Sequence, residues 1–406
     1  MKYNILFIFC FFFSVTTFAQ TTHTAEDSLA MNQIKKSAST TIGGYGEARY
    51  TYSFTDKTAF ANLDRAVLFV GHKFNNKISF FSELEVEDAK VSGGEPGGEV
   101  ALEQAYVKFM LNKNTWLQAG VFIPRMGILN ENHLPTTFNG VDRTFTETFV
   151  IPSTWREVGI GLYGNVQKIQ GLQYSIALVN GLNSAGFESG SGIREGRFEA
   201  RNATATNLAL TGALLYYKGN FRMQLSGYVG GSAGLSPRVA DSLQLSSGMF
   251  GTPVMMGDFN IQYHAKGFAV KFLASAINIS DAEAINRAYA NNTANLIYGG
   301  YAEVAYNVLQ TSKKYADKKL NVFMRYENID LNAQIPTNGI SNGILKQQYI
   351  VAGATFQPIV GIIVKADYVL KQTGEPNSTL VVNQFPQQAP YQKQQGFFNV
   401  GLGYSF

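Results

Sequence analysis

Hydrophobic and polar residues alternate along most of the chain from residue 41 onward. In residues 158–166, for example, Val158, Ile160 and Leu162 share one face, while glycine, tyrosine and asparagine occupy the other. Successive side chains of a β-strand point to opposite sides, so a period of two with one apolar face indicates a sheet that is apolar on one side. The alternation therefore predicts a protein built mainly from strands.

Sixteen segments of this kind can be read in order. They are residues 41–54, 62–74, 77–91, 99–111, 115–124, 156–167, 171–181, 204–217, 220–230, 253–264, 267–278, 297–309, 319–329, 348–357, 360–371 and 395–406. Tight turns such as Lys218-Gly219 alternate with long polar connections, as in outer-membrane barrels with short periplasmic turns and long external loops. The sequence thus predicts an all-β, transmembrane antiparallel barrel of about 16 strands over residues 41–406. Fourteen or eighteen strands stay open, because residues 66–70 are apolar on both faces and the turn at 310–318 is long.

The first residues have the pattern of an export signal. Lys2 gives a positive start, residues 5–13 are apolar, and Thr17-Phe18-Ala19 supplies a small-x-small cleavage site. We expect a signal peptide at residues 1–19 and a polar periplasmic tail at residues 20–40. An uncleaved membrane anchor is the less favoured alternative, since the apolar run is too short to span a bilayer comfortably as a helix.

The composition agrees with export to a membrane. Charged residues make up 15% of the chain, against about a quarter in an ordinary soluble domain, and no long helical stretch is evident. The one cysteine, Cys10, lies in the predicted signal, so we expect no disulfide and no thiolate ligand. The formal charge of +4 forms no basic block, which argues against a nucleic-acid partner. A secreted β-sandwich or solenoid fits the composition but does not explain the alternating loop lengths.

The last segment carries a further signal for membrane insertion. Phe398, Val400, Leu402, Tyr404 and Phe406 alternate with small or polar residues, and the chain ends on phenylalanine. A terminal aromatic strand of this kind resembles the insertion signal of bacterial outer-membrane proteins.

Several short motifs resemble one family. Residues 120–127 end a predicted strand with Pro124-x-x-Gly127, and a long loop with Asn130-Glu131-Asn132-His133-Leu134-Pro135 follows. Glu103-Gln104-Ala105-Tyr106 precedes them and Val179-Asn180-Gly181 comes later. In this order they resemble the phosphate-selective porin O/P superfamily of outer-membrane porins, over most of residues 41–406. The resemblance implies a sixteen-stranded, usually trimeric porin whose third external loop folds into the lumen.

The predicted third external loop, at about residues 125–155, is a candidate constriction of the pore. Facing charges on an inward-folded loop set a transverse field that favours particular ions and dipoles. The candidates in this loop and at the start of the next strand are Arg125, Glu131, His133, Asp142, Arg143, Glu147, Arg156 and Glu157. Solvated charges and salt bridges of an external loop are the alternative.

Charged residues on the polar faces of the strands are candidates for lining the lumen. They are Glu47, Arg49, Glu83, Glu85, Lys108, Lys271, Arg325, Glu327, Lys365 and Asp367. Glu47/Arg49, Arg325/Glu327 and Lys365/Asp367 lie two residues apart on one strand, which predicts ion pairs rather than the cation ladder that phosphate selectivity would need. Arg194, Arg197 and Arg201 in a later loop are a weaker candidate for attracting anions at the mouth.

No pattern indicates an enzyme, a metal site or a cofactor. His23, His72, His133 and His264 have no serine or aspartate at an informative spacing. We therefore expect a porin in the outer membrane of a Gram-negative bacterium that passes small hydrophilic solutes or ions with weak selectivity. Outer-membrane lipid is the expected partner, and the resemblance adds a homotrimer. The alternatives are a structural or adhesive barrel whose external loops bind a partner, and an anion- or phosphate-selective channel.

Overall fold

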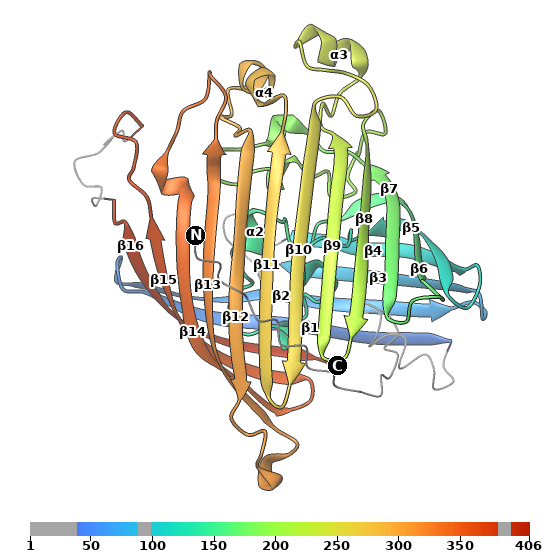
Figure 1. Ribbon diagram of the computed structural model, residues 1–406, viewed down its shortest axis with the longest axis vertical. Coiled ribbons are helices and arrows are strands. Elements are labelled where there is room, and N and C mark those ends of the chain that lie inside the picture. The colour runs from blue at the N-terminus through green and yellow to red at the C-terminus, as the bar shows by residue number, and fades with distance from the viewer. Residues whose placement is uncertain (1–38, 88–98, 381–390) are drawn as a thin grey trace, which may run out of the picture.

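The chain folds into a closed antiparallel β-barrel (Figure 1). The computed structural model describes residues 39–87, 99–380 and 391–406, and the predicted signal peptide and nearly all of the predicted tail lie outside these ranges. Within them, each strand pairs with its neighbours in sequence, and β1 pairs with β16 to close the barrel. The strands are β1 (Thr40–Ser53), β2 (Thr58–Lys73), β3 (Ile78–Glu87), β4 (Glu99–Met110), β5 (Thr115–Phe122), β6 (Glu157–Asn165), β7 (Leu172–Asn180), β8 (Leu208–Lys218), β9 (Phe221–Gly231), β10 (Pro253–Ala265), β11 (Phe268–Ile279), β12 (Leu296–Asn307), β13 (Lys319–Gln334), β14 (Lys346–Ile359), β15 (Ile362–Thr373) and β16 (Gln394–Ser405).

Short helices lie in the connections. They are α2 (Thr146–Phe149), α3 (Pro237–Ser242) and α4 (Ala282–Tyr289), with 3-10 turns η1 (Leu129–Glu131), η2 (Pro135–Thr137), η3 (Ser184–Gly186), η4 (Arg194–Gly196), η5 (Lys313–Tyr315) and η6 (Gly343–Leu345). Among the described residues, no helix is long and apolar enough to cross a membrane.

The predicted fold class is confirmed, with sixteen strands in the described part of the chain. One detail of the sequence prediction is wrong. β2 begins at Thr58 rather than at residue 62, because residues 58–61 extend the ladder with β1 although they show no apolar alternation. The absence of a long helical stretch agrees with the structure, in which α4, of eight residues, buries Ala282 and Ile285.

The two faces of the barrel wall differ in polarity. On β11, for instance, Phe272 is exposed on the outside while Ser275 is buried on the inside, and the same alternation runs through most strands. An outward apolar band with a polar interior is the arrangement of strands that face lipid.

The chain ends close the barrel. The backbone N–H of Gly44 donates to the Phe406 carbonyl at 3.1 Å, and the Phe406 N–H donates to the Gly44 carbonyl at 2.9 Å. Gly43 permits this approach, since a Cβ there would lie 2.7 Å from the Phe406 oxygen. The terminal Phe406 side chain is exposed on the outside.

The two ends of the barrel carry different connections. α3 and α4 project from the end with the long loops, at the top of Figure 1, and the turn that contains η5 projects from the opposite end. Long and short connections are therefore sorted by end, as the sequence predicts.

Candidate functional site

The connection between β5 and β6, residues 123–156, lies inside the barrel. Met126, Val150, Ile151 and Trp155 in this segment are fully buried, and the Trp155 ring packs against Tyr228 of β9 with centroids 4.7 Å apart. We call residues 123–156 the inner loop. Its apolar residues form a continuous core with inward side chains of the wall, so the loop is packed rather than suspended in the lumen.

Carboxylates of the wall hold the backbone of the inner loop. Glu327 on β13 accepts hydrogen bonds from the N–H groups of Phe145 and Thr146, at 3.1 and 2.8 Å, and from the Thr146 hydroxyl at 2.9 Å. Asp367 on β15 accepts from the Val141 N–H at 2.6 Å. Because each carboxylate is fixed to a rigid strand, the loop backbone has a defined position.

A loop carboxylate, Glu147, organises the other half of the inner loop. It accepts from the N–H of Leu129 at 2.7 Å and from the Tyr301 hydroxyl at 2.9 Å. Burial raises the pKa of Glu147, although the backbone N–H groups of Leu129 and Ile128 act in the opposite direction. Gly127 beside it has φ +71°, a left-handed backbone conformation that favours glycine. A Cβ at this position would lie 2.5 Å from Glu147 Oε1, so there is also no room for a side chain.

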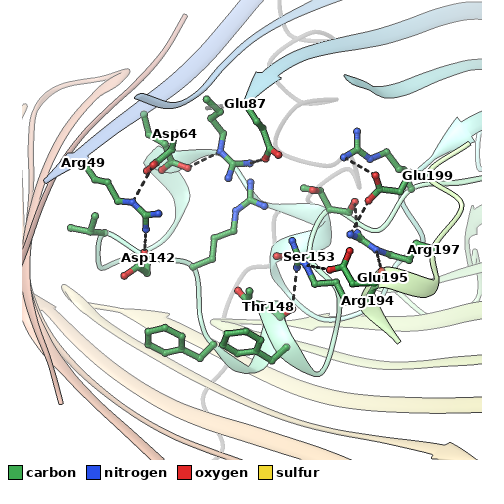
Figure 2. Close-up of a pocket in the computed structure, with 18 residues that line it drawn as sticks. Arg49, Asp64, Glu87, Asp142, Thr148, Ser153, Arg194, Glu195, Arg197 and Glu199 are labelled. Carbon is green, nitrogen blue, oxygen red and sulfur yellow. Dashed lines mark hydrogen bonds and ion pairs between the residues drawn. The ribbon is translucent and has the colours of Figure 1, made fainter. Parts of the chain in front are cut away.

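A cavity of about 420 Å³ lies beside the inner loop (Figure 2), and residues of the long loop between β7 and β8 contribute to its lining. We call it the outer cavity. Six arginines and six acidic residues are among its lining side chains: Arg49, Arg65, Arg143, Arg156, Arg194, Arg197, Glu47, Asp64, Glu87, Asp142, Glu195 and Glu199. They come from β1, β2, β3, the inner loop and the loop after β7, and the two signs are equal in number.

Most of the arginines of the outer cavity are paired with acids. Arg49 binds Asp64 at 3.1 Å and also Asp142. Arg65 binds Glu47 at 2.9 Å, and the pairs drawn in Figure 2 include these contacts.

The opposite wall of the outer cavity has its own ion pairs. Glu199 forms ion pairs with Arg197 at 2.8 Å and with Arg156 at 3.9 Å. Arg194 forms an ion pair with Glu195 at 3.7 Å. Burial lowers the pKa of Arg197 to about 10, and Glu199 opposes this effect. Arg197 therefore still carries its charge at neutral pH.

Arg143 differs from the other five arginines. It forms no ion pair with any residue that the structure describes, and its buried Nε and Nη2 atoms have no hydrogen-bond partner among those residues. Burial and the nearby Arg65 both lower the pKa of Arg143. A guanidinium nevertheless remains protonated at neutral pH. Arg143 is therefore a charged side chain of the outer cavity that makes no ion pair among the described residues, although Glu47, Glu85 and Glu103 act on it electrostatically.

A second cavity, of about 470 Å³, lies on the side of the short turns, and we call it the inner cavity. Its charged lining consists of Lys266, Lys271 and Lys319, with His264 beside them, and no acidic residue of the described chain lines it. Lys271 also lies 3.8 Å from Glu303. The surface of this cavity is consequently basic.

The structure separates the predicted constriction residues into groups. Asp142, Arg143 and Arg156 line the outer cavity. Arg125 instead pairs with Glu131 at 2.8 Å, deeper in the barrel. The remaining candidates are Glu147 in the loop core, His133 against the wall beside β3 and β4, and Glu157, which accepts from the Trp155 indole.

The predicted lumen-lining residues all lie on the inner side of the wall, but only one of the three predicted pairs along a strand forms. Arg325 binds Glu327 at 2.8 Å. The Glu47/Arg49 and Lys365/Asp367 pairs are wrong: Glu47 and Arg49 bind residues of β2, and Lys365 Nζ lies over the Phe138 ring at 3.5 Å. Residues two apart on a strand are about 6.6 Å apart, whereas side chains on adjacent strands approach to about 5 Å.

Sequence reasoning missed Asp64. Glu47 pairs with Arg65 and Ala48 with Leu63, so Asp64 is an extra residue in the β1–β2 ladder. Such a bulge turns two consecutive side chains toward the same face, and both Asp64 and Arg65 line the outer cavity. The one signal in the sequence was that this strand does not alternate cleanly.

A Gly-x-Ser-x-Gly spacing, at residues 230–234, was also missed. It does not form a nucleophile elbow, which needs an exposed serine on a strand-to-helix turn. Ser232 is fully buried and its hydroxyl donates to the Thr252 carbonyl at 2.6 Å.

Solved outer-membrane channels have a similar barrel. The anion-selective porin from Comamonas acidovorans superposes with TM-score 0.56 and 13% identity, over 91% of this chain and 99% of that one. DcaP of Acinetobacter baumannii superposes with TM-score 0.54 and 12% identity, over 90% of this chain and 97% of DcaP. OmpF of Salmonella typhi superposes with TM-score 0.55 and 14% identity, over 90% of this chain and 97% of OmpF. These likenesses confirm a porin fold, and at such identities they define the class of fold and nothing finer.

One relative is similar in sequence. The chain is 32% identical over 349 residues to an uncharacterised protein of Aquifex aeolicus (strain VF5), which covers 83% of this chain and 76% of the relative. The chain belongs to the same family as this Aquifex protein. No family model matches it.

Proposed function

We propose that this protein is a passive outer-membrane channel for small hydrophilic solutes, with a modest preference for anions. The outward apolar band supports insertion into the outer membrane. Selection of solutes would occur at the inner loop, between the outer and inner cavities. No chemistry is assigned to the protein, and no cofactor is needed for diffusion through a fixed passage.

The observation that carries the proposal is Arg143. The other lining charges are five arginines and six acidic residues, most of them in ion pairs, so without Arg143 they set a local field with a slight negative balance. Arg143 adds an unpaired cation at the surface of the inner loop. An entering anion gains the guanidinium as a partner, and an entering cation meets repulsion, so the passage is biased toward anions.

The inner cavity supports the same preference. An anion that passes the inner loop meets Lys271 and Lys319 on the side of the short turns, with no acidic lining residue among those described. The ion pairs of the outer cavity limit the effect, because they neutralise most of its arginines. We therefore propose a weak preference rather than the strict phosphate selectivity of the family that the sequence resembles.

Reversal potentials in planar bilayers test the role of Arg143. In a KCl gradient, the wild type should show a chloride preference, and Arg143→Gln should reduce it toward zero or reverse it. Arg238→Gln is the matched control, since Arg238 is exposed in the helix α3, away from both cavities. It removes the same charge and should leave the reversal potential unchanged.

Two results would contradict the proposal. An equal change for Arg143→Gln and Arg238→Gln would mean that only overall charge matters. A barrel that folds but gives no reproducible channels would favour the structural or adhesive alternative. Added phosphate should compete weakly with chloride, and a complete block at low concentration would point to a phosphate-specific site instead.

We also propose that the barrels assemble as homotrimers. One structure with a similar fold, OmpT of Vibrio cholerae, is described as a trimer form, at TM-score 0.50 and 10% identity. Analytical ultracentrifugation in detergent checks the proposal, and a monomer at all concentrations would exclude it.

A further inference from the structure

Three buried ionisable side chains meet where the inner loop touches the wall, apart from both cavities. Glu83 of β3, Glu103 of β4 and His133 of the inner loop are each fully buried. His133 Nε2 lies 3.9 Å from Glu83 Oε1 and 3.7 Å from Glu103 Oε2. We propose that these residues bind a zinc ion, which fastens the inner loop to the barrel wall.

A β-bulge delivers Glu103 to this position. Glu83 pairs with Gln104, while the next residue, Leu84, pairs with Leu102, so Glu103 is the extra residue in the β3–β4 ladder. Glu103 and Gln104 are both buried on the inside, whereas Leu102 is exposed on the outside. Bulges often occur where a strand must re-aim a side chain, and here the bulge brings a second carboxylate beside the first.

Each of the two carboxylates has an oxygen atom that could bind a ligand. Gln104 donates to Glu83 Oε2 at 2.8 Å and so orients that side chain. Glu83 Oε1 and Glu103 Oε1 are buried and have no hydrogen-bond partner among the described residues. Two buried carboxylates side by side are costly unless cations compensate them. Arg143 and Arg156 act on Glu103 electrostatically without forming an ion pair with it, and a divalent ion would add positive charge in direct contact.

The spacing of the donor atoms fits a first-row metal ion. One donor from each residue lies within 4.8 Å of the others. With sides of 3.7 Å, 3.9 Å and at most 4.8 Å, a central point lies about 2.2–2.5 Å from each donor, and shifts of a few tenths of an ångström give the ~2.0–2.2 Å of zinc bonds.

The donor types narrow the choice of ion. An imidazole among carboxylates favours zinc over magnesium or calcium. Tyr45 Oη lies 3.0 Å from His133 Nε2 and 3.2 Å from Glu103 Oε2, so a fourth oxygen lies beside two of the three donors.

Metal analysis of the folded full-length barrel tests the proposal. The protein is stripped with a chelator, and it is then either titrated with zinc chloride or refolded with it, since a buried site can require loading during folding. After gel filtration, elemental analysis should find about one zinc per chain in the wild type. His133→Ala and Glu103→Gln should each lose it, and zinc-edge X-ray absorption should report only nitrogen and oxygen ligands.

Matched variants separate this site from surface binding. His72→Ala removes an imidazole far from the cluster, and Glu375→Gln removes an exposed carboxylate. Both should keep the full zinc content. If His133→Ala does not fold, Glu103→Gln, which keeps the side-chain volume, decides the question. Absence of stoichiometric zinc from the folded wild type under both loading conditions would overturn the proposal, as would equal zinc content in the wild type and Glu103→Gln.

Discussion

Glu327 is the strongest single anchor of the inner loop, and its removal should release that loop. Glu327→Ala deletes three hydrogen bonds to Phe145 and Thr146 and the ion pair with Arg325, whose side chain is only 1% exposed. Hydrogen bonds to a buried carboxylate are worth about 1.5–3 kcal/mol each. The Arg325 pair lies within β13 and does not join the loop to the wall. The three hydrogen bonds are not additive, so we take about 3–5 kcal/mol as the loss in docking free energy.

Hydrogen exchange measured by mass spectrometry reports this change directly. The amides of residues 141–151 exchange when the loop opens locally. Each 1.4 kcal/mol is a factor of ten, so this loss predicts exchange about 10²- to 4 × 10³-fold faster in Glu327→Ala. Peptides from β8, whose amides hydrogen-bond to β7 and β9 within the wall, should not change.

Glu375→Ala is the control for this experiment, because Glu375 is exposed and its side chain pairs only with Lys393 among the described residues. If the loop peptides of Glu327→Ala were as protected as those of the wild type, the inner loop would be held by its apolar core instead. The hydrogen bonds of Glu327 would then be a consequence of docking and not its cause.

Two further predictions concern the inner loop. Burial raises the pKa of Asp142, against the opposing effect of Arg49, so Asp142 is protonated at a higher pH than an ordinary aspartate. As the pH falls through this raised pKa, the outer cavity loses a negative charge, and the anion preference measured by reversal potentials should grow. Asp142→Asn should flatten this pH dependence. The same pH dependence in the wild type and in Asp142→Asn would show that another group is responsible. Gly127→Ala should weaken loop docking by about 1–3 kcal/mol, seen as faster exchange of the loop amides. Gly219→Ala, at φ +59° with nothing within 4 Å of the added Cβ, should leave their exchange unaltered.

The barrel could be predicted from the sequence because its determinants are local. Alternation with a period of two marks each strand, and the sorting of short and long connections follows from which end of the barrel they join. The error occurs where residues without alternation lengthen a strand through pairing with its neighbour, as at Thr58.

The pairing of charges could not be predicted in the same way. Whether Arg49 meets Glu47 or Asp64 depends on the register between β1 and β2, and a one-residue bulge decides it. The bulge at Glu103 has the same consequence for His133, which lies 30 residues away in the sequence. Alternation within one segment carries no information about register between segments, so the sequence identified the charged residues and not their partners.

Permeation into liposomes tests the central claim most directly. Purified barrel is inserted into vesicles, and swelling is followed in iso-osmotic solutions of neutral sugars, small carboxylates and small amines. The account predicts swelling that slows steeply with solute size, with carboxylates faster than amines of equal size. Vesicles that contain folded barrel and swell no faster than empty vesicles, for every solute, would contradict it.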